Sequence, residues 1–391
     1  MTRAVALIDG EHYAPVVRDA LAELPYEFVG AILLGGTEKL RGGEEYGVPL
    51  LSSVDEVDAE VVVDLSDEPV LSPADRMLWA SRALAAGMRY EGSDFSFAPP
   101  ELHPFGLPSL AVIGTGKRVG KTAVTGHVAR LLARDREVVV VSMGRGGPPE
   151  PLVAEVSPTV DDLLALSRSG GHAASDYLET AALAGVVTIG CRRCGGGMAG
   201  APFVSTVLEG ARLAEARAPD VVVFDGSGAA IPPVAADARI LVAHDVGSGL
   251  NPYRVLVADL VLTMYEDVAE AAATLAQAPV VRFTLRLQPV EPLAGRRVAV
   301  FTTGPAPVDH LDAEVVSVSR SLADRDALRQ DLASTDAEVW VVEIKAAAID
   351  VVAEAAAERG AEVVFADNEV VALDGDLDAA ILALADRAVR A

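Results

Sequence analysis

The sequence predicts an α/β protein in which a doubly wound parallel sheet is flanked by an N-terminal α/β domain and a C-terminal α/β lobe. Two observations support this fold class. Runs rich in Val and Ile alternate with Ala- and Leu-rich stretches along the chain, which is typical of βαβ units. A Gly- and Lys-rich loop over residues 114–122 also follows an apolar run and precedes apolar residues with helical spacing.

Composition and charge narrow the function classes. The chain has 391 residues, of which 51% are hydrophobic, so more than one domain with a sizeable core is expected. No run of 18 apolar residues occurs and no signal-peptide pattern begins the chain, so we expect a cytoplasmic protein without a membrane partner. A formal net charge of −25 excludes nucleic acid as a partner and requires local positive charge wherever an anion binds.

Strand-like segments fall into three blocks, which we expect to be domains over residues 1–100, 108–290 and 296–391. A Pro-rich stretch over 96–109 is typical of a linker between the first two blocks. The strand-like segments of the first block are 4–9, 28–34 and 59–65. Those of the third block, which predict either a separate lobe or an extension of another sheet, are 298–304, 337–344 and 361–367.

The middle block has enough strand-like segments for one doubly wound sheet. They are 110–114, 137–143, 185–190, 220–226, 238–244, 259–264 and 279–285. The first of them leads directly into the loop over residues 114–122. The middle block is therefore predicted to be the P-loop NTPase-like domain of the chain.

The loop GTGKRVGKT predicts a nucleotide phosphate site at the start of a helix. Gly120, Lys121 and Thr122 match the end of the pattern G-x-x-x-x-G-K-[ST], whereas Thr115 stands at the position of its first glycine. Backbone N–H groups at a helix N-terminus bind phosphate oxygens, a lysine reaches the outer phosphates, and a threonine hydroxyl binds Mg²⁺. We expect ATP and Mg²⁺ here, with ATP bound by Gly114, Thr115, Gly116, Lys117, Arg118, Val119, Gly120, Lys121 and Thr122.

Acidic side chains near this loop are candidate magnesium ligands beside Thr122. Asp225 ends the apolar run VVVFD, which places its carboxylate at the C-terminal end of a strand. Asp245, in LVAHDVGSG, occupies a similar position and is the alternative. Glu150 follows another strand-like segment and is a candidate base or metal ligand, while a solvated surface role fits it equally well.

Three Gly-rich segments carry arginines and predict a second anionic ligand besides ATP. Arg145 lies in SMGRGGPPEP, and Arg192 and Arg193 lie in CRRCGGGMAG. The third segment, SRSGGHAASDY, adds Arg168, His172 and Asp176. Guanidinium forks suit phosphate oxygens, and glycines allow the backbone to approach a ligand closely. The expected partner is therefore a small phosphorylated acid, and a homodimer is compatible with the sequence.

Cys191 and Cys194 have the spacing of a CxxC motif. Two cysteines cannot form a four-thiolate zinc site, and the flanking residues differ from those of thioredoxin-like proteins. We expect structural thiols, with a redox pair as the alternative.

Several motifs together resemble the cyclic 2,3-diphosphoglycerate synthetase family: LIDGEHYAPV, AILLGGTEKL, GTGKRVGKT, MGRGGPPEP and GCRRCGGGMAG. The resemblance implies that ATP drives closure of 2,3-diphosphoglycerate into an intramolecular anhydride, with release of ADP and phosphate. It also implies that Lys121 and Thr122 serve ATP and Mg²⁺, while Arg145, Arg192 and Arg193 bind the phosphates of the substrate. The catalytic residues expected on these grounds are Lys117, Lys121, Arg145 and Asp225.

Two other functions fit parts of the sequence. The phosphate loop is similar to that of dethiobiotin synthetase, so a ligase acting on another small acid is an alternative. A nucleotide-switch protein is a second alternative, although the N-K-x-D motif of GTP-selective proteins does not occur in the sequence and LTMYED is only a loose echo of it.

Overall fold

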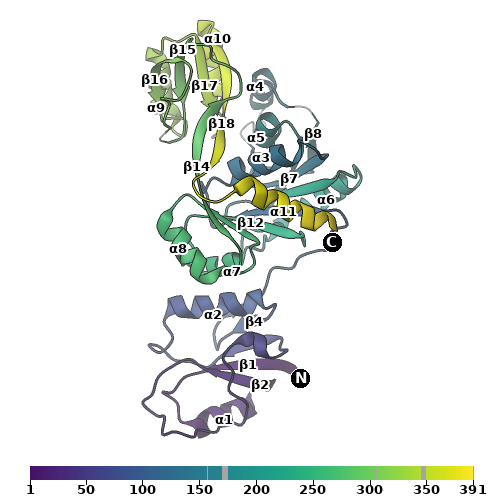
Figure 1. Cartoon of the computed structure of the whole chain (residues 1–391), viewed down its shortest axis with the longest axis vertical. Helices are drawn as coiled ribbons and strands as arrows, with labels where there is room; N and C mark the ends of the chain where they lie inside the picture. The colour runs from purple at the N-terminus through teal and green to yellow at the C-terminus, as the bar shows by residue number, and fades with distance from the viewer. Residues whose placement is uncertain (156, 170–174, 305, 345–348, 391) are drawn as a thin grey trace.

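The structure is a computed structural model of the chain and describes residues 1–155, 157–169, 175–304, 306–344 and 349–390. Figure 1 shows three parts arranged along the long axis, with the N-terminal domain at one end and the C-terminal lobe at the other. Within the described residues, none of the helices has the length and apolar character needed to cross a bilayer.

The N-terminal domain is a five-stranded sheet in the order β2-β1-β3-β4-β5. Its elements are β1 (Thr2–Ile8), α1 (Ala14–Glu23), β2 (Tyr26–Leu33), η1 (Val54–Glu56), β3 (Val61–Asp64), α2 (Pro73–Ala85), β4 (Arg89–Glu91) and β5 (Ser96–Phe97). β1, β2 and β3 confirm the three strands predicted in this block. β1 and β3 lie inside the sheet and are mostly buried, whereas β2 is an edge strand.

The central part is a doubly wound sheet whose parallel strands follow the order β9-β7-β11-β6-β12-β13-β14. Its first elements are β6 (Ser109–Gly114), α3 (Lys121–Leu132), β7 (Val138–Gly144), β8 (Leu152–Ala154), α4 (Val160–Arg168), α5 (Asp176–Ala184) and β9 (Val187–Cys194). The others are β10 (Val204–Ser205), α6 (Val207–Glu215), β11 (Val221–Asp225), β12 (Ala238–Ala243), α7 (Asn251–Leu256), β13 (Leu260–Thr263), α8 (Glu266–Leu275) and β14 (Val280–Pro289). All seven predicted strands of the middle block are confirmed.

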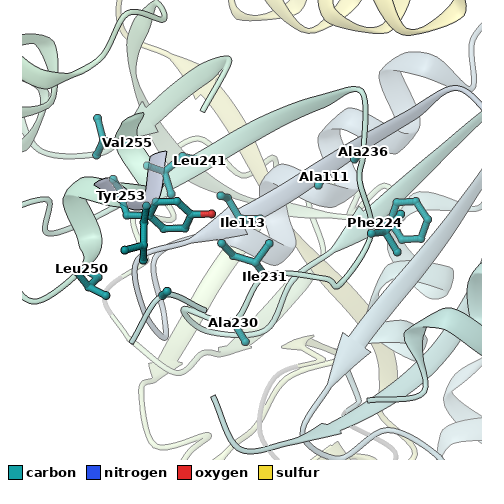
Figure 2. Packing of buried hydrophobic residues seen from close by; sticks show 14 of the residues in the cluster. Ala111, Ile113, Phe224, Ala230, Ile231, Ala236, Leu241, Leu250, Tyr253 and Val255 are labelled. Atoms are coloured by element: carbon teal, nitrogen blue, oxygen red, sulfur yellow. The ribbon is translucent and has the colours of Figure 1, made fainter. Parts of the chain in front are cut away.

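Two hydrophobic clusters cover the two faces of this sheet, because successive side chains of a strand point to opposite sides. In β6, Leu110 and Val112 pack in the cluster that includes α3. Ala111 and Ile113 pack in the other cluster, with α6 and α7. Figure 2 shows part of this second cluster, in which Ile113 lies near Tyr253 of α7.

The C-terminal lobe continues the central sheet, because β14 pairs antiparallel with β18. Its elements are β15 (Arg297–Phe301), β16 (Glu314–Ser319), α9 (Arg325–Ser334), β17 (Val339–Glu343), α10 (Ile349–Arg359), β18 (Glu362–Ala372) and α11 (Leu377–Arg390). Of the two arrangements predicted for this block, the structure has the sheet extension. The last helix, α11, returns to the central part and packs against α3 (Figure 1).

Candidate active site

The phosphate loop lies between β6 and α3 at the carboxyl edge of the central sheet, where α/β folds bind ligands. Gly120 is the N-cap of α3 and adopts a left-handed conformation with φ 90°, which favours glycine. Gly116 has little room for a side chain, since a Cβ there would lie 2.8 Å from Cε1 of His244. Thr115, at the position of the missing glycine, is buried, and its hydroxyl lies 2.9 Å from Nδ1 of His244.

Lys121 and Asp225 form a buried ion pair beneath this loop. The ammonium of Lys121 contacts Oδ1 of Asp225, and the hydroxyl of Thr125 donates to the same oxygen over 3.0 Å. Asp225 is fully buried; burial raises the pKa of its carboxyl group, and Lys121 opposes that shift. Asp245, the alternative magnesium ligand predicted from the sequence, instead accepts from the backbone N–H groups of Gly247 and Ser248 in its own turn.

The structure gathers cationic side chains beside the phosphate loop. A Cβ on Gly228 would lie 3.6 Å from Nη2 of Arg193 and 4.0 Å from Cγ of Lys117, so both side chains pass close to this glycine. Burial lowers the pKa of Arg193, and the nearby charge of Arg145 lowers it further. Like charges close together are unfavourable unless an anion binds between them, so this cluster favours a polyanionic ligand.

Tight backbone packing brings the Arg145 loop onto the end of β9. A Cβ on Gly147 would overlap the carbonyl oxygen of Cys191 and approach Cα of Arg192 to 2.9 Å. Only glycine therefore fits here, which explains why GRGG follows β7. The guanidinium of Arg193 donates to the carbonyl of Gly195 over 2.7 Å and to that of Ser227 over 2.8 Å.

The remaining predicted residues lie in different surroundings. Arg192 and Glu150 are exposed, and the backbone N–H of Arg192 donates to the hydroxyl of Thr206. Arg168 forms an ion pair of 3.3 Å with Glu354 on α10, so its described contact is with the C-terminal lobe. His172 lies outside the described residues.

Asp176, the acid of the Gly-rich segment SRSGGHAASDY, also lies in this site. It is the first residue of α5, and a Cβ on Gly144 would lie 3.6 Å from its Oδ2. Burial and Lys121 have the largest effects on the pKa of Asp225, and the negative charge of Asp176 has the next largest and raises that pKa. A first-turn acid of a helix is common on protein surfaces, so the signal in the sequence is the Gly-rich, arginine-bearing segment that contains Asp176.

The C-terminal lobe also reaches the phosphate loop. Thr122 and residues of α5 line a small cavity together with Asp367 and Asn368 of β18. Asp367 is held there by Arg130 of α3, with 2.8 Å between Nη2 and Oδ2. The lobe therefore contributes part of the wall behind the start of α3.

The two cysteines do not form a pair. Cys191 is buried against Gly210 of α6, and burial raises the pKa of its thiol to about 12. Cys194 is exposed three positions further along the same strand, where its side chain points to the opposite face of the sheet. This geometry agrees with structural thiols.

We expect replacement of the cysteines to leave the chemistry nearly unchanged. Cys194→Ser should change kcat/KM by less than about twofold, because an exposed thiol makes no buried contact. Cys191→Ser should lower the free energy of unfolding by about 1–2 kcal/mol, since it replaces a thiol packed in a hydrophobic cluster by a smaller and more polar group. Kinetic assays and urea unfolding test both variants. Strict loss of activity together with reversible sensitivity to oxidants would support a redox pair instead.

The DGEHY turn of the N-terminal domain is organised around a buried carboxylate. Asp9 is inaccessible to solvent; it accepts from the backbone of Glu11 over 3.0 Å and from Nδ1 of His12 over 2.8 Å. Its other oxygen accepts from the backbone of Asp67 over 2.7 Å. Burial raises the pKa of Asp9, but hydrogen bonds from Asp67, His12 and Glu11 outweigh it, so the pKa falls below its ordinary value of 3.8.

This shift predicts how the stability contributed by Asp9 depends on pH. A carboxylate whose pKa is lower in the folded state stabilises fully above its unfolded pKa and loses that contribution as the pH falls through its folded pKa. Asp9→Asn should therefore cost about 1–3 kcal/mol at pH 7, and the cost should shrink below pH 3.8. Urea unfolding of both proteins across this range tests it; a cost that grows on acidification would contradict the assignment.

Comparisons with known proteins give a consistent result along the whole chain. Residues 3–98, 109–281 and 289–369 match family models described as the N-terminal, P-loop and C-terminal domains of cyclic 2,3-diphosphoglycerate synthetase. The chain is 50% identical over 435 aligned positions to the cyclic 2,3-diphosphoglycerate synthetase of Rubrobacter xylanophilus, which covers 99% of this chain and 98% of the relative. It is 41% identical over 425 positions to that of Thermococcus kodakarensis, with 98% of each chain covered.

A more distant likeness is found among solved structures. LpxK from Aquifex aeolicus in complex with ATP superposes with a TM-score of 0.45 and 15% identity, covering 74% of this chain and 90% of that one. This score is too low to bear on the ligand or the reaction.

Proposed function

Because the chain belongs to the cyclic 2,3-diphosphoglycerate synthetase family, we propose that it is an ATP-dependent ligase that closes 2,3-diphosphoglycerate into its cyclic anhydride. The observation that carries this proposal in the structure is the group of cations Lys117, Arg145 and Arg193 beside the phosphate loop. In a chain with a net charge of −25, such a group favours a ligand with more phosphate than ATP alone. Use of ATP favours a cytoplasmic location.

The reaction needs no nucleophile from the protein. An oxygen of one substrate phosphate attacks the γ-phosphorus of ATP, whose bond to the bridging oxygen breaks, and ADP leaves with the electron pair. An oxygen of the neighbouring substrate phosphate then attacks the activated phosphorus. The ring closes and the transferred group leaves as inorganic phosphate, so the products are the cyclic anhydride, ADP and phosphate. Catalysis then depends on positioning and on neutralising charge.

We expect the residues of the phosphate loop to hold ATP. Backbone N–H groups at the start of α3 would bind phosphate oxygens, and Lys121 would reach the outer phosphates. Lys117, exposed at the crown of the loop, adds charge on the side of Arg193. Arg145 and Arg193 then bind the phosphates of the acid.

We expect Thr122 and one carboxylate of the site to hold a magnesium ion. Within the described residues, no group of three or more His, Cys, Asp or Glu side chains is arranged to hold a metal. Magnesium in phosphoryl-transfer sites is held by one or two protein oxygens, phosphate oxygens and water, so the hydroxyl of Thr122 with Asp225 or Asp176 is a sufficient set. Magnesium would neutralise part of the phosphate charge. Glu150, exposed in its loop, is retained as a weaker candidate.

Phosphorus NMR of the purified protein with ATP, Mg²⁺ and 2,3-diphosphoglycerate tests the proposed function. We expect the two phosphomonoester signals to be replaced by anhydride signals, with ADP and phosphate appearing in equal amounts. ATP consumption with no anhydride signal would contradict the proposal and favour a nucleotide switch. A product formed only from another small acid would favour a ligase of the dethiobiotin synthetase kind, which the family membership does not favour.

A further inference from the structure

Arg254, on the short helix α7, is a buried cation bonded only to neutral groups. It is 1% exposed, and burial lowers its pKa to about 10, so it is protonated at neutral pH. Nε and Nη2 donate to the carbonyl of Ala229 over 3.0 and 2.6 Å, and Nη1 donates to the carbonyls of Met198 and Leu250 over 3.1 Å each. In the part of the chain that the structure describes, no carboxylate forms an ion pair with it.

The three carbonyls belong to three loops at the carboxyl edge of the central sheet. Met198 lies in the loop that follows β9, and Ala229 lies in the loop that follows β11. Leu250 ends the loop after β12. One guanidinium therefore joins the loops that follow three strands around the phosphate loop.

Arg193 joins two of the same loops from the ligand side. Its guanidinium donates to Gly195 in the first loop and to Ser227 in the second. A backbone bond of 2.9 Å from Ile231 to Gly200 also connects them. Two arginines and this backbone bond therefore hold the loops together. Arg193 belongs to the cation cluster, and Arg254 lies on α7 behind the loops.

The position of Arg254 is itself fixed by packing on both sides. Leu250, Tyr253 and Val255 lie in a hydrophobic cluster with Ile231 and Leu241 (Figure 2). On its other side, α7 packs against α2 of the N-terminal domain (Figure 1). Because α7 is held on both sides, the planar guanidinium of Arg254 can fix the positions of the loops to which it donates.

We propose that Arg254 is a positioning residue that holds the β9 and β11 loops at the spacing needed for Arg193 to bind a phosphate of the acid substrate. The inference rests on the proposed function of the site. An apolar side chain of similar size would avoid the cost of burying a charge, so stability alone does not account for a guanidinium here. Its fork reaches carbonyls in three loops at once, which an ammonium on a flexible stem cannot do with the same geometry.

Kinetics of Arg254→Lys and Arg254→Gln test this role. Both variants should raise KM for 2,3-diphosphoglycerate about tenfold, equivalent to about 1.4 kcal/mol, and change KM for ATP less than twofold. Arg359→Lys is the matched control, because Arg359 also donates to backbone carbonyls, of Leu332 and Ala333, but lies in the C-terminal lobe. It should leave both constants unchanged. Wild-type constants in Arg254→Lys, or equal increases in both KM values, would overturn the proposal.

Two further measurements separate positioning from a general loss of structure. In a double-mutant cycle, Arg193→Ala and Arg254→Gln should be non-additive in KM, since both act through the same loops; additive effects would count against the coupling. Hydrogen exchange without ligands should be faster over 195–203 and 226–232 in Arg254→Gln and Arg254→Lys, and unchanged over 114–122. Unchanged exchange in both loops would overturn the proposal. Exchange decides this point even if the wild-type protein fails to convert 2,3-diphosphoglycerate, which would refute only the proposed function.

Discussion

Lys121→Ala should lower kcat/KM by at least about 10³-fold, equivalent to about 4 kcal/mol of transition-state stabilisation. The ammonium of Lys121 lies at the start of α3, beside backbone donors suited to phosphate oxygens, and contacts the buried Asp225. Loss of this ammonium removes the positive charge that would stabilise the phosphoryl group during its transfer from ATP to the acid. Lys121→Arg should not restore activity, because a planar fork is wider than the space beneath the loop.

A control is needed because Lys121 also supports the fold. Its removal leaves the carboxylate of Asp225 buried with only the hydroxyls of Thr125 and Ser142 as partners, which should cost about 3–5 kcal/mol of stability. The double variant Lys121→Ala/Asp225→Asn has no unpaired buried charge and should recover much of that stability without recovering turnover. Thermal unfolding and single-turnover assays measure the two effects separately. Near-normal turnover in either variant would remove the assignment of Lys121 to ATP.

The sheets could be predicted because their strands have an unusually clear pattern. Parallel strands buried on both faces need continuous runs of Val, Ile and Leu, as in VVVV of β7 and VVVF of β11. The glycines of the phosphate loop are required by its geometry as well as by the sequence pattern. Gly116 approaches His244 closely, and Gly120 adopts a left-handed conformation. The sequence predicts Asp225 at this edge as a magnesium ligand opposite Thr122, because carboxyl ends of neighbouring parallel strands meet there. The ion pair of Asp225 with Lys121 is a finding of the structure.

Other features depend on contacts between residues far apart in the chain. The pairing of β14 with β18 joins segments about 80 residues apart, and no local pattern distinguishes it from a separate lobe. The short strands β4, β5, β8 and β10 carry two or three residues each and have no periodicity to detect. Arg254 belongs to the site only through tertiary placement, because in the sequence it follows NPY outside any Gly-rich segment. Arg168 is the opposite case. It lies in a Gly-rich segment of the sequence, but the structure pairs it with Glu354 of the C-terminal lobe.

Arg192→Ala and Arg193→Ala should weaken binding of 2,3-diphosphoglycerate while leaving ATP affinity within about twofold of wild type. The two side chains lie on opposite faces of β9, because neighbouring residues of a strand alternate. Arg193 is partly buried and bridges two loops, whereas Arg192 is exposed and bonded through its backbone. We therefore expect the larger effect from Arg193, about 10- to 100-fold in kcat/KM, and a smaller rise in KM from Arg192.

The physical reason is the charge that ring closure brings together. At about 4 Å and an effective dielectric of about 20, each pair of unit charges on the two phosphates repels by about 4 kcal/mol, and nearby guanidinium groups offset this as the anhydride forms. Lysine at either position should restore only part of the loss, since it keeps the charge and loses the two-point contact. Titration calorimetry of each variant with ATP and with 2,3-diphosphoglycerate separately is the decisive measurement. If ATP affinity collapses while the acid still binds, these arginines serve the nucleotide, and the acid must bind elsewhere along the edge of the sheet.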